Sequence, residues 1–141
     1  MPPRTLSNIA AAKPQDEKIT INVGFVDLGQ IDLLVQEGFY ANRTDLIRTA
    51  IRNQLAAHAD AVRQAVSRKM LVLGIHHFSA DDLRAIEQRG ETVDMRVLGL
   101  ASIAPDVTPE LARATIASLS VLGSFHASAG VKAALADRMR S

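Results

Sequence analysis

The sequence predicts an α+β protein in two parts, a dimeric strand–helix–helix unit followed by a repeat of strands and helices. Three observations support this fold class. Residues 18–23 alternate between polar and apolar side chains, which indicates a half-buried β-strand. Two amphipathic helical patterns follow, separated by Gly38. A short apolar phrase that ends in glycine then recurs, as Met70–Gly74, Met95–Gly99 and Leu119–Gly123.

The composition limits the possible classes of protein. The chain has 141 residues, a hydrophobic content of 48%, a net charge of +1 and no cysteine. This length can bury one real core or two small ones. Disulfides and thiolate metal sites are excluded, and no apolar run approaches the ~20 residues that cross a bilayer. We therefore expect a cytoplasmic protein, and the charge by itself does not indicate a nucleic-acid partner.

Residues 1–16 are expected to form a flexible N-terminal arm, because they contain three prolines and only a short apolar patch. The arm has no long apolar segment and is therefore not a secretory signal. It also carries Arg4 and Lys13, so the alternative is an arm that lies against DNA.

The predicted strand has one apolar and one polar face. The apolar side chains are Ile19, Ile21 and Val23. The outward side chains are a cation, a hydroxyl and a carboxamide, those of Lys18, Thr20 and Asn22. A lone strand cannot satisfy its own backbone edge, so we expect it to pair with the same strand of a second copy. A two-stranded ribbon fits the DNA major groove, where such polar side chains can contact base edges.

The first predicted helix follows this strand. Asp27 can cap it, and Gly38 is expected to end it, since glycine tolerates positive φ. Its apolar stripe consists of Leu28, Ile31, Leu34 and Val35.

The second predicted helix opens at Asn42, which has capping-box spacing with Asp45. Free N–H groups and the positive end of the helix dipole at this start are suited to a phosphate oxygen. The residues concerned are Asn42, Arg43 and Thr44.

The order of these elements, with Asn42-Arg43-Thr44-Asp45-Leu46-Ile47-Arg48, resembles the ribbon-helix-helix superfamily and within it the CopG-like bacterial transcriptional regulators. The resemblance places the DNA-binding domain at residues 17–57. It implies that a ribbon from a homodimer enters the major groove. Base contacts would come from Lys18, Thr20 and Asn22, and phosphate contacts from Asn42, Arg43 and Thr44. Many relatives have proline just after the strand, where this chain has Gly24-Phe25-Val26.

Residues 58–69 are predicted to extend the second helix, because no glycine or proline occurs between Gly38 and Gly74. The helix would either run straight or bend once near Ala56-Ala57. His58 lies on its apolar face and is expected to be a packed or interface residue.

Residues 70–141 are predicted to form a β/α repeat with parallel strands that serves oligomerisation. The glycine-ending phrases are spaced by 25 and 24 residues. Helices are predicted between them, with Ser79 and Thr108 as N-caps, and a closing helix from Ser128 to Arg138. This spacing is typical of a short solenoid of the leucine-rich-repeat kind. A compact βαβαβ layer is the alternative.

No set of residues indicates catalysis. His77 and His126 would lie two strands apart with Ser102 between them, roughly 10 Å from the usual strand spacing, which is too far to share a metal. Asp81, Asp82 and Asp106 are expected to mark helix starts. Neither a nucleophile elbow nor a Walker-type loop is present. We expect no enzyme, no metal and no cofactor.

The sequence therefore favours a transcriptional regulator, a repressor that binds double-stranded operator DNA at the nucleoid. A three-unit stack exposes apolar ends, so residues 70–141 would join dimers into tetramers or larger assemblies. An antitoxin or plasmid-maintenance protein, which shares the motif, remains an alternative, as does a structural protein whose repeats polymerise. A ligand-sensing role for residues 70–141 becomes the better reading if the protein stays a dimer.

Overall fold

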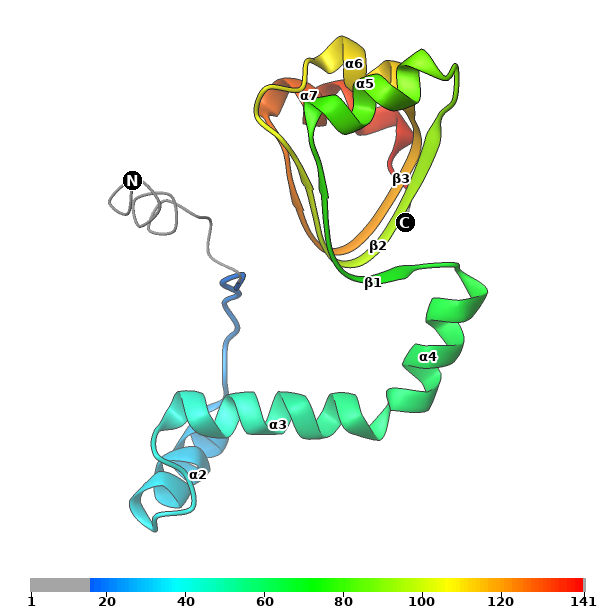
Figure 1. Cartoon of the computed structure of the whole chain (residues 1–141). Helices are drawn as coiled ribbons and strands as arrows, with labels where there is room; N and C mark the ends of the chain where they lie inside the picture. The colour runs from blue at the N-terminus through cyan, green and yellow to red at the C-terminus, as the bar shows by residue number, and fades with distance from the viewer. Residues whose placement is uncertain (1–15, 141) are drawn as a thin grey trace, which may run out of the picture. The chain divides into compact units, whose positions relative to one another are not determined.

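The computed structural model describes residues 16–140 (Figure 1). The predicted arm of residues 1–16 lies outside this range except for Asp16. Contacts divide the chain into two compact units, and the boundary in the sequence lies between Asn53 and Gln54. The elements, in chain order, are α2 (Phe25–Gln36), α3 (Arg43–Ala57), α4 (Ala59–Arg68), β1 (Val72–Phe78), α5 (Ala80–Gln88), β2 (Val93–Ile103), α6 (Pro109–Thr115), β3 (Ile116–His126), α7 (Ala129–Leu135) and the 3-10 helix η1 (Ala136–Arg138).

Helix α2 begins earlier than the sequence predicts. Its N-cap is Gly24, not Asp27, and Gly24 provides no side-chain cap bond. The N–H of Leu28 donates to the Gly24 carbonyl at 2.9 Å, so the first turn has already closed when the chain reaches Asp27. The predicted end is confirmed, because Gly38 has φ +85° and the N–H of Phe39 reaches back into the last turn.

Residues 18–23 are exposed and pair with no other strand in the described chain. A strand is defined by its hydrogen-bonded neighbour, and the neighbour expected here belongs to a second copy. The ribbon therefore stays a prediction.

The second predicted helix bends once, which confirms the expectation of a bend over that of a straight helix. Helix α3 ends at Ala57 and α4 begins at Ala59, with His58 as its N-cap. The His58 ring lies 3.2 Å from the Gln54 amide and is exposed in the single chain. It is thus not packed within its own chain, and its interface role stays a prediction.

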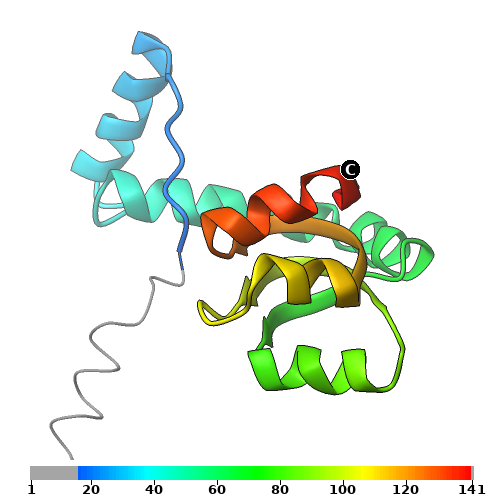
Figure 2. The ribbon, with the colours of Figure 1, turned by 90° about the horizontal axis from the view of Figure 1, so that it is seen from above.

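The C-terminal unit has a parallel sheet with strand order β1-β2-β3. The glycines of the three predicted phrases lie in register, Gly74 beside Gly99 and Gly99 beside Gly123. Helices α5, α6 and α7 lie side by side along the sheet (Figure 2). Strands β2 and β3 extend beyond the predicted five-residue phrases on both sides. Strand β1 continues past Gly74 but begins at Val72, so the prediction was wrong for Met70 and Leu71, whose N–H groups close the end of α4.

Each strand contains a glycine at positive φ, and the strands bend strongly (Figure 1). A Cβ atom on Gly99 would lie 2.2 Å from the carbonyl oxygen of Gly74, and one on Gly123 would lie 2.1 Å from that of Gly99. Two of the three glycines are therefore required by close approach of the backbone as well as by φ.

The core lies between the sheet and its helices. Side chains at alternate positions of β2 are buried, and they meet buried residues of the helices. The largest fully buried side chains are Leu83, Met95, Ile116, Leu119, Leu135, Val97, Val131 and Thr115. The hydroxyl of Thr115 is satisfied, since it donates to the Leu111 carbonyl at 2.8 Å.

The predicted N-caps of this unit are confirmed. The Ser79 hydroxyl accepts from the Asp82 N–H, and the Asp82 carboxylate accepts from the Ser79 N–H, which completes a capping box and lowers the pKa of Asp82. The Thr108 and Ser128 hydroxyls cap α6 and α7 by accepting from the N–H groups of Leu111 and Val131.

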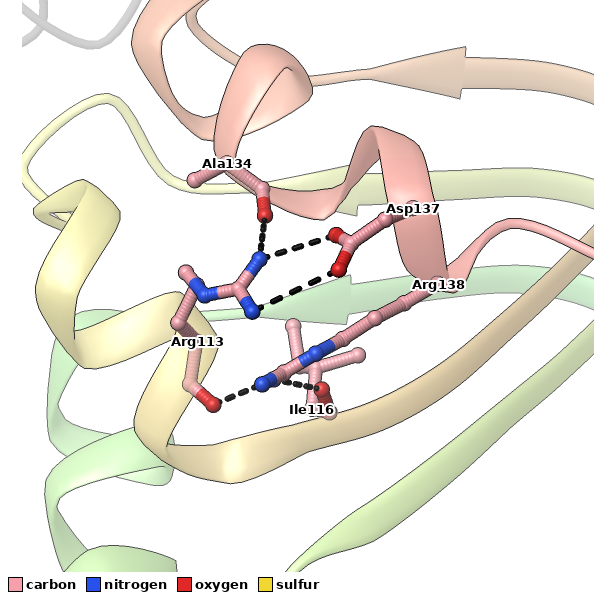
Figure 3. A network of polar contacts seen from close by, with 5 residues as sticks. All are labelled: Arg113, Ile116, Ala134, Asp137 and Arg138. Carbon is pink, nitrogen blue, oxygen red and sulfur yellow. Dashed lines mark hydrogen bonds and ion pairs between the residues drawn. The ribbon is translucent and has the colours of Figure 1, made fainter.

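The last residues are fastened to the β3 side of the unit (Figure 3). Arg113 donates to Asp137 at 2.8 Å and to the Ala134 carbonyl at 2.6 Å. Arg138 donates to the carbonyls of Arg113 and Ile116. This network joins α6, α7 and η1 to the start of β3, and it lowers the pKa of Asp137.

Candidate nucleic-acid interface

The candidate base-reading side chains lie on one extended segment. Lys18, Thr20 and Asn22 are all exposed, as predicted from their outward positions. The chain stays extended up to Gly24, whose φ of −61° and ψ of 152° then allow α2 to begin. The three side chains are therefore available to a ligand, and the backbone beside them is open.

The opposite face of this segment is uncovered. Ile19 is 78% exposed and Ile21 is 70% exposed, although both are β-branched residues suited to a core. No residue of α2 or α3 is buried. A unit of this size needs buried apolar side chains to be stable, so its described residues alone leave its core incomplete.

The start of α3 has the predicted cap with one difference. The Asn42 side chain accepts from the Asp45 N–H at 2.8 Å. The Asp45 carboxylate bonds the N–H of Ala41 at 3.0 Å, not that of Asn42, so the capping box is displaced by one residue. Asp45 and Asn42 thus fix the first turn of a 15-residue helix.

Arg43 has a structural partner that the sequence analysis did not identify. Its Nε and Nη2 donate to the two carboxylate oxygens of Asp32 at 2.8 and 2.9 Å. This hydrogen-bonded pair lowers the pKa of Asp32 and raises that of Arg43. The bonds leave Nη1 outside the pair. The spacing of 11 residues crosses a turn, so neither helical periodicity nor a local motif could have indicated it.

The C-terminal unit brings its histidines into the predicted order. Ser102 lies in register with His77 on one side and with His126 on the other. The His77 ring is 3.2 Å from the Ser102 hydroxyl. Among residues 16–140 no group of three or more His, Cys, Asp or Glu residues is arranged to hold a metal ion.

One pocket of this unit was not predicted. It has a volume of about 570 Å³ and is lined by three cationic residues and a carboxylate, Lys69, Arg96, Arg140 and Asp94, together with Leu71, Ala117, Ser118 and Ser120. The Ser118 hydroxyl donates to Asp94 at 2.6 Å. The cationic residues come from segments far apart in the sequence, which is why no motif indicated the pocket.

No described helix has both the length and the apolar character that crossing a membrane requires. Neither the curated proteins nor the solved structures include a significant match to this chain. A family model does match: residues 14–132 fit that of the Ribbon-Helix-Helix transcriptional regulator family. The matched range runs from before the predicted ribbon strand into α7, so it covers both units.

Proposed function

The chain belongs to the ribbon-helix-helix transcriptional regulator family, a family of DNA-binding regulators and not of enzymes, and from this premise we propose that it is a CopG-like repressor that reads operator DNA as a homodimer. Residues 18–23 of two copies pair as an antiparallel ribbon. The ribbon enters the major groove and places Lys18, Thr20 and Asn22 against base edges.

The observation that carries this proposal is the uncovered apolar surface of the N-terminal unit. Ile19 and Ile21 lie on the face opposite to the polar readers, and Ile51 and Leu55 on α3 are 48% and 60% exposed. A second copy would bury these side chains and pair the open strand in one step. Dimerisation would therefore fold the unit and present the polar face to DNA.

Phosphate binding follows from the start of α3. Asn42 holds the first turn, and the N–H groups of Arg43 and Thr44 occupy its first two positions. An N-terminal turn of this kind favours an anionic oxygen. Arg43 would add Nη1, while its other nitrogens hold Asp32. These contacts would set the position of the ribbon in the groove without reading sequence.

Selection of bound duplexes from a random pool tests this proposal. A dimer should select a two-fold-symmetric pair of half-sites, and its affinity should fall as salt is raised because phosphate contacts release counterions. The control is the full chain with alanine at Lys18, Thr20 and Asn22, which should still bind duplexes but select no common sequence. Enrichment of the same sequence by both proteins, or of none by either, would contradict the proposal.

The C-terminal unit is proposed to join dimers. It has its own core, so its fold does not depend on DNA, and its sheet still exposes Leu73, Ile75 and Leu122. Contacts made through this sheet would give tetramers, and a tetramer binds tandem operators with higher avidity than a dimer.

A second function of the C-terminal unit has one observation in its favour, the cationic pocket. Lys69, Arg96 and Arg140 face one carboxylate, that of Asp94, which is already bonded by Ser118. The volume suits a small anionic effector. Citrate and inorganic phosphate should raise the melting temperature of the protein, and Arg96→Gln should reduce this shift. An equal shift in both proteins, or none in either, would exclude the sensing role.

A further inference from the structure

Strand β1 is the exposed strand of the sheet. None of its residues is buried, whereas β2 contributes four buried residues and β3 two. Val72 is 44% exposed, although its register partner Val97 on β2 is 1% exposed. The core that covers Val97 thus does not extend over Val72, and the unit is open at this end.

The two edges of the sheet differ. At the β3 edge, Met139 forms a parallel bridge with Leu119, and the N–H of Arg140 donates to the Leu119 carbonyl at 2.6 Å. The bonds of Arg113 and Arg138 fasten the segment that leads to this bridge (Figure 3). At the β1 edge, no segment of residues 16–140 pairs with the strand. The described chain therefore covers the β3 edge at Leu119, whereas it covers no position along the edge of β1.

Glycine at position 74 keeps the open edge clear. At Gly99 and Gly123 an added Cβ would meet the carbonyl of the preceding strand. The equivalent site at Gly74 has nothing within 4 Å, because no strand precedes β1. A side chain there would point out of the open edge and obstruct a neighbour. Glycine instead allows another backbone to approach.

Strand β1 also lacks the features that usually prevent pairing at an edge. Natural edge strands carry lysine, other charges or proline for this purpose. The segment Val72–Phe78, Val-Leu-Gly-Ile-His-His-Phe, contains no lysine, arginine, aspartate, glutamate or proline. Two copies of it can approach each other without bringing formal charges together.

We propose that β1 pairs in antiparallel fashion with β1 of a second copy, about a two-fold axis at Ile75. Pairing of one edge with the same edge is isologous and closes after two chains. The Met139–Leu119 bridge occupies the β3 edge only at that position, so closure of the pair of C-terminal units rests on its two-fold symmetry. The result is a continuous six-stranded sheet with the α5 helices adjacent. The inference rests on the proposed function in one respect, since it specifies how the C-terminal units join.

Cross-linking tests the pairing directly, because the chain has no cysteine. Residues directly opposite in an antiparallel pair have Cβ atoms about 4.5–5.5 Å apart, which is close to disulfide geometry. The full-length Ile75→Cys variant should form a disulfide-linked dimer under oxidised glutathione. The control Leu122→Cys, on the other edge strand, should form at least about tenfold less at the same protein concentration. Equal cross-linking of the two, or none at position 75, overturns the proposal.

A second pair of variants distinguishes a contact through the β1 edge from a contact through the outer face of the sheet. Leu73 and Leu122 occupy the same register row on β1 and β3, and both are exposed. Leu73→Lys should halve the assembly mass measured by light scattering with an unchanged circular dichroism spectrum, and Leu122→Lys should leave the mass intact. A loss of mass in both variants would place the contact on the outer face of the sheet. An unchanged mass in both variants would show that β1 does not form the contact. Operator binding is measured in parallel: its absence in the unmodified protein contradicts the DNA proposal and leaves the cross-link result standing.

Discussion

Arg43 and Asp32 form a bidentate ion pair that joins the first turn of α3 to α2. The two side chains are 57% and 44% exposed, so the pair lies at the surface and sets the position of two helices that have no buried residue between them. It ties the turn proposed to bind phosphate to the helix that follows the ribbon.

We expect the pair to make stability depend on pH. A carboxyl whose pKa is lowered by folding stabilises the folded state above its unfolded pKa, and this contribution is lost as pH falls through the lowered pKa. Asp32→Asn should therefore be less stable than the unmodified protein above about pH 5, and the difference should shrink below about pH 4, the ordinary range of aspartate. Fluorescence of Tyr40, the single tyrosine of a chain without tryptophan, can follow unfolding of this unit. Asp60→Asn, which removes an ion pair within α4, should show no such profile at Tyr40.

Two threonines allow a matched test of the DNA contacts. Thr20→Ala should reduce the preference for operator over scrambled duplex by about 1–3 kcal/mol, because it removes a contact to a base edge. Thr44→Ala removes the hydroxyl and keeps the N–H at the start of the helix, so it should weaken binding to both duplexes by the same modest factor, because phosphate contacts carry no sequence information. Competition binding at one fixed salt concentration measures both quantities. The assignment is wrong if the two variants change the preference equally.

The glycines in register on the three strands, Gly74, Gly99 and Gly123, predict that a single added methyl group lowers stability strongly. Gly99→Ala combines the strain of φ +138° with a Cβ placed 2.2 Å from the Gly74 carbonyl oxygen. Gly90→Ala carries backbone strain alone, at φ +67° with nothing within 4 Å. Strain costs about 1–3 kcal/mol, and overpacking adds roughly as much again. Chemical denaturation followed by circular dichroism should therefore rank Gly99→Ala well below Gly90→Ala, and equal stabilities would refute the close approach.

Met70 predicts a stabilising substitution. Three helices, α2, α4 and α5, end in the same hydrogen-bond pattern, with residue 38, 70 or 90 at positive φ. Two of these positions hold glycine, but Met70 adopts φ 54° with its side chain 68% exposed. Met70→Gly should raise the free energy of unfolding by about 1 kcal/mol, since a side chain in this region costs about 1–2 kcal/mol. Met70→Ala keeps the strained conformation and should give no comparable gain.

Much of the fold could be predicted because local chemistry determines it. Ser79, Thr108 and Ser128 cap helices where their hydroxyls reach a backbone N–H three residues ahead. Gly38 ends α2 by its φ, and the spacing of the repeated phrases matches the strand register. Each of these features depends on residues close in sequence, or on a repeat that is visible in it.

The remaining features depend on contacts that no local pattern encodes. The Arg43–Asp32 pair, the fastening of Arg113 to Asp137 and the cationic pocket each join residues that are not neighbours in sequence. The predicted start of α2 was wrong. Asp27 is a good capping residue, but the extended backbone of Gly24 allows the first turn of the helix to form earlier in the chain. The proposed DNA-reading residues can be named from sequence, but the ribbon that they would form needs a second chain.

The register of the sheet also bears on how the C-terminal unit folds. Every pairing in it joins residues only 23 to 25 positions apart, from Val93 beside Ile116 to Val72 beside Val97. Loops of this length close at modest entropic cost. Each strand can thus be completed soon after synthesis of its neighbour, one unit after another. The C-terminal unit would thus fold without a second copy, with β1 in place before the proposed pair of units forms.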